Sequence, residues 1–245
     1  FTRGDRFLFA DGGRIHIVHG GSDEVTVFHY DLDLKPLGRT TIKAELPDFG
    51  GFHPSGDGFR YMIFGQRNVD DDDGKVVYRI VKYDRSWSKV GQADLRDVYV
   101  GTPFYGSNVT MDNRDGLLVV HSARERYLTE DGYRHQSNIT FKIRTSDMAV
   151  LDKGGEWPIT HVSHSFATYV KFDEDRIVYA DHGDAVRSFV IRREEDGAIT
   201  DEANIIPFPG AAGNNYTGSH LGGLEVTGSH YLLAGSSVYD EHGTE

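Results

Sequence analysis

Short apolar segments alternate with tight turns along the chain, and this alternation recurs at a nearly constant spacing. Five apolar segments each follow a turn rich in glycine or acidic residues: Arg14–Val18, Tyr61–Phe64, Leu117–Val120, Ile177–Ala180 and Tyr231–Ala234. The turns are centred near residues 12, 57, 115, 174 and 228, at intervals of 45, 58, 59 and 54 residues. Segments of this length and composition, bounded by glycine and aspartate, are typical of β-strands.

A second pattern follows the apolar segments. Val25–Tyr30 and Val77–Tyr83 alternate in polarity, and each ends in a Tyr-Asp pair, the two pairs lying 53 residues apart. Asn138–Ile143 and Arg187–Ile191 occupy the equivalent place in later repeats. A period of two is the side-chain period of a strand, and no segment shows a helical stripe with capping residues. Each repeat is therefore expected to contain four antiparallel strands, A to D.

One four-stranded sheet cannot cover both of its faces, but a ring of such sheets buries each face against a neighbour. We therefore predict an all-β fold, a β-propeller of four-stranded antiparallel blades, as a single domain over residues 1–245. A sandwich or an up-and-down barrel is the alternative, and neither predicts a four-strand repeat at this spacing. The expected blades span about 6–45, 50–98, 105–155, 163–206 and, as a partial blade, 218–245.

The fifth repeat shows candidates for only its first two strands. A longer chain with six or seven blades would supply the missing strands, and this is the arrangement we favour. The alternative arrangement is that the N-terminal strands close the ring in an unusual way. Because an unclosed ring leaves unpaired sheet edges, further blades or domains of a longer chain are expected partners.

Composition excludes several classes of function. The net charge is −12, from 38 acidic and 26 basic residues, so a nucleic-acid phosphate backbone would be repelled. No segment approaches the roughly 20 apolar residues needed to span a bilayer, so no membrane span is expected. The absence of cysteine excludes disulfides, thiolate metal sites and a cysteine nucleophile.

Propeller topology predicts where a binding site would lie. The B–C and D–A loops gather on one face of the disc, and strand A lines the central channel. Long loops on a rigid scaffold commonly carry binding residues. The sixteen-residue segment Ser122–Ser137 is predicted to be the richest such loop, since Arg124, Tyr127, His135 and Gln136 suit recognition of carboxylates and hydroxyls. A structural role as a bridge to the next blade is the alternative.

Two further segments contain candidate ligand-binding residues. Asp181, His182 and Asp184 are predicted to lie in a compact loop and could bind a ligand, although a plain structural turn would need similar residues. The acidic run Asp70–Asp73 has the composition of a calcium loop, because calcium prefers several carboxylate ligands. Its spacing departs from the EF-hand pattern, so a solvated acidic hairpin tip is expected there.

Histidines recur near the predicted start of strand A. If the positions are equivalent, His53, His164 and His220 approach the channel mouth from different blades. Converging imidazoles could bind a divalent metal (calcium, manganese or zinc) or donate to an anionic sugar or carboxylate. The alternative is that polar residues simply pack near the crowded axis, with water satisfying the rings.

Two stretches resemble repeats of large, uncharacterised bacterial cell-surface propellers. Ser122–Phe141 contains R-x-x-Y, D-G-x-x-H-Q and N-x-T-F elements, and Ser163–Ala185 contains S-H-S-F and D-H-G-D-A. In that group a proline commonly follows the second stretch, whereas Val186 and Arg187 follow it here. The resemblance implies a propeller fold and an extracellular or cell-surface setting. It does not indicate any particular activity.

Three classes of function follow from these observations. The first is a non-enzymatic, extracellular or surface-displayed binding module for carbohydrate or another surface polymer, using the loop face. The second is a metal-assisted lyase or hydrolase acting on an acidic polysaccharide, with the three histidines holding the ion and Arg124 pairing with the substrate carboxylate. The third is a structural or protein-interaction scaffold, which predicts a flat loop face without a pocket.

Overall fold

The chain folds into successive antiparallel sheets in a computed structural model that describes residues 6–238. Blade 1 contains β1 (Arg6–Asp11), β2 (Arg14–Gly20), β3 (Glu24–Tyr30) and β4 (Pro36–Lys43). Blade 2 contains β5 (Asp48–Pro54), β6 (Arg60–Gly65), β7 (Tyr78–Tyr83) and β8 (Lys89–Leu95). Blade 3 contains β10 (Thr110–Arg114), β11 (Leu117–Leu128), β12 (Arg134–Arg144) and β13 (Ala149–Asp152), and β11 also pairs with the short β9 (Thr102–Pro103). Blade 4 contains β14 (Ser165–Asp173), β15 (Arg176–Gly183), β16 (Ser188–Glu195) and β17 (Ala198–Pro207), and blade 5 contains β18 (His220–Thr227) and β19 (His230–Ser236).

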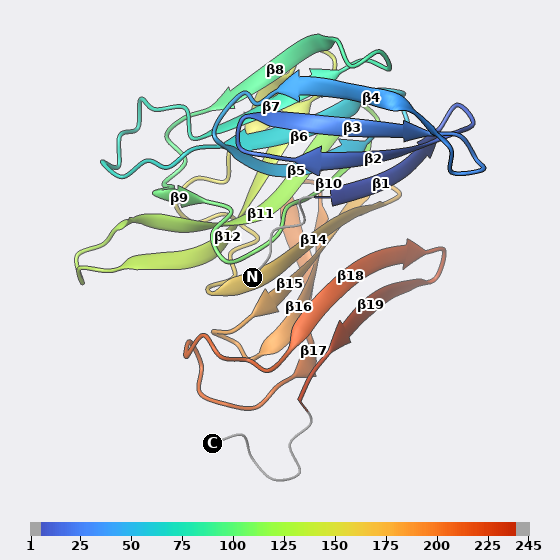
Figure 1. The fold of residues 1–245 in the computed structure, drawn as a ribbon. Helices are drawn as coiled ribbons and strands as arrows, with labels where there is room; N and C mark the ends of the chain where they lie inside the picture. Colours follow the sequence, from blue (N-terminus) through green and yellow to red (C-terminus); the bar gives the residue numbers. More distant parts are fainter. Residues whose placement is uncertain (1–5, 239–245) are drawn as a thin grey trace.

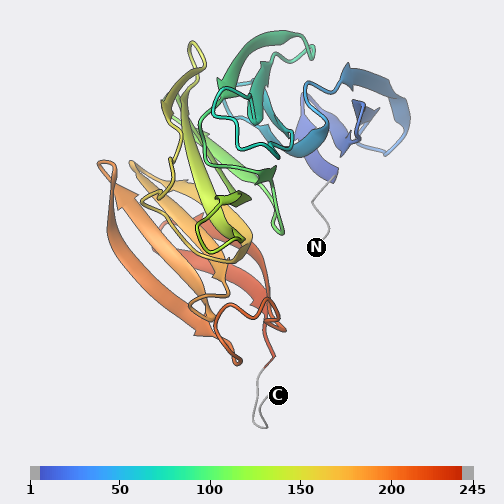
Figure 2. The ribbon, with the colours of Figure 1, turned by 90° about the vertical axis from the view of Figure 1, so that its left-hand side faces the viewer.

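The predicted fold class is confirmed: the protein is all-β and built from four-stranded antiparallel blades, with the fifth incomplete. The strands of each blade pair in sequence order (Figure 1). Figure 2 shows the blades following one another along an arc, from blade 1 in blue to blade 5 in red. Along this arc the first strands β5, β10, β14 and β18 contact one another in succession. Residues 239–245 of the predicted fifth blade lie outside the described residues. Within residues 6–238, no helix is long and apolar enough to cross a membrane.

The turns between the first two strands of each blade explain why the repeat is visible in the sequence. Two-residue connections join β1 to β2 and β10 to β11, as the pairs Asp11 with Arg14 and Arg114 with Leu117 show. Both residues of the first turn, Gly12 and Gly13, have positive φ angles of 58° and 73°. This is the conformation in which a hairpin turn matches the strand twist, and glycine adopts it without steric cost.

Apolar side chains fill most interfaces between blades. Blades 1 and 2 share a cluster that includes Val27, Phe49 and Phe64, and blades 4 and 5 share one that includes Phe189 and Leu221. Blades 2 and 3 share the largest such cluster, which contains residues of both blades from Tyr61 to Met148. The cluster between blades 3 and 4 is much smaller, with four buried members: Val119, Val170, Ile177 and Tyr179. The blade 3–blade 4 interface therefore differs from the others, and polar groups occupy much of it.

Side chains of blade 3 hydrogen-bond to the backbone edge of β14. Asn108 Oδ1 accepts from Thr168 N at 2.8 Å, and Asn108 Nδ2 donates to Thr168 O at 3.0 Å. Thr110 Oγ1 and Asp112 Oδ2 accept from the N–H groups two and four residues further along β14, at 3.0 and 2.8 Å. The spacing of two residues matches the period of a strand. Side chains on one face of β10, and of the residues just before it, therefore hydrogen-bond to every second backbone N–H along the edge of β14. We call these three side chains the edge ladder.

The edge ladder predicts a stability loss on removal of its amide. Asn108→Ala leaves the N–H of Thr168 without its partner, while Thr168 O keeps the bond from Thr110 Oγ1, so we expect the free energy of unfolding to fall by about 1–3 kcal/mol. Urea denaturation followed by far-UV circular dichroism measures the change. Asn204→Ala, at an exposed position of β17, is the matched control and should change stability by less than about 0.5 kcal/mol. Equal stability of the two variants would contradict a stabilising role for the edge ladder.

Candidate functional site

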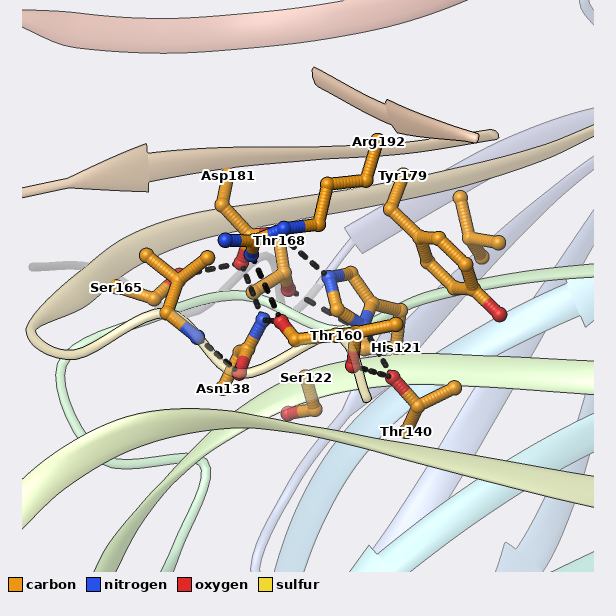
Figure 3. Close-up of polar contacts among 12 residues, drawn as sticks. His121, Ser122, Asn138, Thr140, Thr160, Ser165, Thr168, Tyr179, Asp181 and Arg192 are labelled. Carbon is orange, nitrogen blue, oxygen red and sulfur yellow. Dashed lines mark hydrogen bonds and ion pairs between the residues drawn. The ribbon is translucent and has the colours of Figure 1, made fainter. Parts of the chain in front are cut away.

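A buried carboxylate organises the interface between blades 3 and 4 (Figure 3). Asp181 Oδ1 accepts hydrogen bonds from Ser165 Oγ at 2.8 Å and from Asn138 Nδ2 at 3.0 Å. Asp181 Oδ2 lies 3.2 Å from His121 Nε2, and all four side chains are buried. An ionised carboxylate only accepts, so His121 carries a hydrogen on Nε2, and its Nδ1 is hydrogen-bonded to Thr140 Oγ1 at 2.9 Å. Four strands, β11, β12, β14 and β15, are joined through this one group.

Although serine, histidine and aspartate meet here, their order is not that of a hydrolytic triad. In a triad the histidine lies between the serine and the aspartate and removes the serine proton. Here Asp181 lies between the other two, and Ser165 donates to Asp181 and not to His121. All three side chains are shielded from solvent, with at most 1% of each exposed. The arrangement therefore positions strands and is unsuited to nucleophilic catalysis.

The predicted compact loop Asp181–Asp184 is wrong, because residues 181–183 belong to β15 and Asp184 follows it directly. The side chains of Asp181, His182 and Asp184 are buried, and each contacts a different set of residues. The His182 ring meets the rings of Phe189 and Phe208 edge-on, at centroid distances of 5.3 and 5.1 Å. Burial lowers the pKa of His182 to about 4, so the ring is neutral at pH 7. These three residues do not form one ligand set.

Asp184 anchors the segment that follows blade 4. Its Oδ2 accepts from the backbone N–H of Asn215 at 3.0 Å, and its Oδ1 pairs with Arg187 Nη1. Arg187 in turn donates to Tyr216 O at 3.2 Å. His164 Nδ1 lies 3.6 Å from Asp184 Oδ2. The Asp184 carboxylate thus positions the connection around Asn215, and the backbone N–H of Asp184 donates to His164 O at 2.9 Å.

The predicted loop Ser122–Ser137 is also wrong, because β11 and β12 continue through most of it and only residues 129–133 turn. Arg124, predicted to contact ligand, is fully buried. Its Nη1 donates to Val98 O at 2.6 Å and to Gly155 O at 2.8 Å, and its Nη2 donates to Glu156 O at 2.7 Å. Burial lowers the pKa of Arg124 to about 10, so it remains charged at neutral pH. Arg124 therefore joins backbone segments instead of facing solvent.

Tyr127 and the acidic run fasten the β11–β12 hairpin to blade 2. Tyr127 Oη donates to Asp73 Oδ1 at 3.0 Å and accepts from Asn68 Nδ2 at 3.2 Å. Arg134 pairs with Asp71, with Nη1 and Oδ1 2.6 Å apart. Asp71 and Asp73 therefore hold the hairpin, whereas a fully solvated acidic tip was expected from the sequence. These contacts make the hairpin a fixed projection from blade 3.

A cleft of about 480 Å³ opens where blades 3 and 4 meet beside this hairpin. We call it the His164 cleft; its walls include Tyr105, Glu125, Gln136, His164, Phe166 and Asn215. The rings of His164 and Phe166 are nearly parallel, with an interplanar angle of 8° and centroids 6.4 Å apart. The His164 side chain is 23% exposed. Among the predicted site residues, the structure brings Gln136, His164 and Asp184 together.

Gln136 is a buried member of this wall with an unused acceptor. Its Nε2 donates to Tyr105 O at 3.1 Å and to Ser165 O at 2.5 Å, which fixes the orientation of the amide. Its Oε1 is buried and has no hydrogen-bond partner among residues 6–238. Nearly all buried polar atoms in proteins are hydrogen-bonded, so such an atom calls for a partner. Gln136 also borders a second cleft on the other side of the hairpin.

The predicted convergence of His53, His164 and His220 on a metal is wrong. Within the described part of the chain, no group of three or more His, Cys, Asp or Glu side chains is placed to hold an ion. The reason is register: β5 begins at Asp48, so His53 lies near its end, where it bonds Asn113 at 2.8 Å. His164 precedes β14 and His220 begins β18, at the opposite ends of their strands.

Sequence reasoning missed several residues of the His164 cleft. Phe166 lies two residues after His164 in the S-H-S-F segment, but His164 is in a turn before β14 with a φ angle of 51°, so strand alternation does not predict that the two rings lie side by side. Tyr105 and Asn215 enter from segments distant in sequence, and no local pattern indicates them. His135 was predicted but lies near the hairpin turn, where its Nε2 is 2.7 Å from Asp131 Oδ2.

No protein-family model matches this chain, and no curated protein matches it. Among solved structures, an ACO/RPE65 chimera in a monoclinic crystal form is similar with a TM-score of 0.51 and 12% identity, covering 94% of this chain and 56% of that chain. A prolyl endopeptidase has a TM-score of 0.49 and 15% identity, covering 95% of this chain and 32% of that chain. A thermostable family-43 glycoside hydrolase has a TM-score of 0.44 and 9% identity, covering 98% and 95%. The chain thus spans little more than half of the first of these proteins and a third of the second, and the likeness to the chimera supports the β-propeller fold alone.

The neutral, buried His182 predicts a pH-dependent stability. Its pKa is about 4 in the folded protein and 6.5 when unperturbed, so the unfolded chain binds more protons between these values. Stability is therefore lost as pH falls from 6.5 towards 4. His182→Phe keeps an aromatic ring among the phenylalanines and removes the titration, so the loss should shrink by about 3 kcal/mol. Urea denaturation at pH 7 and pH 4 measures this loss of unfolding free energy. His230→Phe, at an exposed position, is the control. An unchanged pH dependence in His182→Phe would refute the assignment.

Proposed function

We propose that this chain is a non-enzymatic binding module, extracellular or surface-displayed, that holds a carbohydrate or similarly hydroxyl-rich polymer in the His164 cleft. The observation that carries the proposal is the cleft itself, which combines the rings of Tyr105 and Phe166 with the partly exposed imidazole of His164. Gln136 supports this wall, because its Nε2 donates to the backbone carbonyls of Tyr105 and Ser165.

The other walls of the cleft suit the same class of ligand. Tyr105, 47% exposed, and Phe166 provide ring surfaces for the C–H faces of a sugar. The His164 side chain is 23% exposed, and an imidazole nitrogen can donate to or accept from a hydroxyl group. Aromatic surface combined with a few fixed polar groups is the usual composition of small-molecule sites. Because the hairpin is tied to blade 2, little ordering would accompany binding.

The two other classes of function lose support from the same geometry. A metal-assisted lyase or hydrolase was expected to use three converging histidines, and those histidines lie apart. Its second requirement, Arg124 at the substrate carboxylate, conflicts with the complete burial of that side chain. A scaffold predicts a flat loop face, whereas a cleft with polar and aromatic walls is found. Binding of a small or chain-like ligand therefore accounts best for this face.

The proposal predicts that loss of the His164 imidazole weakens carbohydrate binding. His164 has a φ angle of 51°, which asparagine tolerates, so His164→Asn removes the ring with little backbone cost. Isothermal titration with oligosaccharide probes (cellohexaose, laminarihexaose, mannohexaose and oligogalacturonate) is the measurement. We expect at least one probe to bind and its affinity to fall about tenfold in the variant, or about 1.4 kcal/mol.

His230→Asn is the matched control, since His230 is exposed and starts β19 on blade 5. It should bind like the unchanged protein. Equal thermal melting curves of the two variants would exclude unfolding as the cause of weaker binding. Failure of every probe to bind the unchanged protein, or equal affinity of His164→Asn, would overturn the proposal.

A further inference from the structure

The two tryptophans of the chain lie in opposite environments. Trp87 is 9% exposed, with the Arg60 guanidinium 4.4 Å from its ring centroid. Trp157, in the connection between β13 and β14, is 64% exposed. A large aromatic side chain left in water forgoes the stabilisation that burial would give, so its exposure needs a reason.

Trp157 is exposed but not free to reorient. The guanidinium of Arg126 lies over the indole at 4.0 Å from the ring centroid. The His161 ring meets the indole edge-on, with centroids 4.7 Å apart and an interplanar angle of 66°. Arg126 is itself 5% exposed and its Nη2 donates to Glu156 Oε1 at 3.0 Å. The indole is thus held in place by a buried cation and by the His161 ring, while 64% of the side chain remains exposed to solvent.

Beside this indole lies a cleft of about 580 Å³, on the far side of the hairpin from the His164 cleft. We call it the Trp157 cleft; its walls include Arg126, Asp131, His135, Glu156, Trp157 and His161. Two of its polar atoms, Arg126 Nε and His161 Nδ1, are buried and have no hydrogen-bond partner in the part of the chain that the structure describes. These two atoms lie beneath the surface, and the walls present a fixed, exposed aromatic side chain beside the exposed carboxylates of Glu156 and Asp131.

The charge of the walls limits the ligand. Glu130, Asp131 and Glu156 face one arginine, Arg126, so the carboxylates outnumber it. Burial, with the nearby arginines, lowers the pKa of His161 to about 4, and the ring adds no positive charge at pH 7. The whole chain carries −12. An acidic sugar or a phosphate would be repelled, whereas a neutral sugar would not.

We propose that the Trp157 cleft binds a neutral pyranose, with the C–H face of the sugar stacked on the exposed surface of Trp157 and its hydroxyls donating to the exposed carboxylates of Asp131 and Glu156. An exposed indole surface matches the flat apolar side of a pyranose ring. An ionised carboxylate accepts hydrogen bonds from hydroxyl groups. None of these three residues belongs to the walls of the His164 cleft.

Tryptophan fluorescence tests the inference directly. In Trp87→Phe, whose fold is verified by far-UV circular dichroism, all indole emission comes from Trp157. Titration with cellohexaose, laminarihexaose and mannohexaose should give, for at least one probe, a saturable blue shift and reduced quenching by acrylamide. Oligogalacturonate of equal length should give neither. No response to any neutral probe up to about 10 mM, the range of very weak affinity, would overturn the inference.

Variants that retain Trp87 distinguish binding at the two clefts. Trp157→Ala, at an exposed position, should weaken binding of the responding probe at least tenfold in isothermal titration, and Trp157→Phe should retain part of the affinity. His164→Asn should leave the Trp157 response intact. Undiminished binding by Trp157→Ala would refute the Trp157 site, even if His164→Asn abolishes a separate binding event and so supports the proposed function.

Discussion

The buried carboxylate of Asp181 is the group on which the junction of blades 3 and 4 depends. Three side chains from β11, β12 and β14 donate to its two oxygens, so a charge that is costly to bury is fully hydrogen-bonded. Removal of one partner from such a buried charge typically costs several kcal/mol, whereas apolar contacts can adjust in small steps. The other described blade junctions are mainly apolar. This junction therefore has a more narrowly defined geometry, and both candidate clefts open beside it.

The fold could be predicted from the sequence because turns and apolar strands are local features. The site could not be predicted in the same way, because polar character was taken as evidence of loops. Residues 122–137 and 181–184 are polar, yet they are mostly strand, since their side chains pair across a blade junction instead of facing water. His53 was expected near the start of its strand, whereas β5 already begins at Asp48 and includes Gly50 and Gly51, which resemble a turn in the sequence.

The β11–β12 hairpin connects these structural findings to binding. Arg124 bonds its base to neighbouring carbonyls, and Tyr127 and Arg134 tie its outer part to blade 2. Because the hairpin is fixed at its base and at its outer part, it can form a wall of both clefts with little conformational freedom. Gln136 borders both clefts, so one amide is placed between the two surfaces. The residues that the sequence suggested as direct ligand contacts thus matter chiefly as supports for others.

The edge ladder has a consequence for how such a chain could diversify. Thr110 and Asp112 bond to N–H groups of β14, which every residue except proline provides. The side chains at those β14 positions are therefore not selected by these contacts. Substitutions at those β14 positions could accumulate without compensating changes in the edge ladder, whereas any blade that replaced blade 4 would still have to supply the Asp181 carboxylate to His121 and Asn138. Recognition through the main chain thus leaves the sequence of β14 evolutionarily permissive, and the buried carboxylate confines the evolutionary constraint to a few side chains.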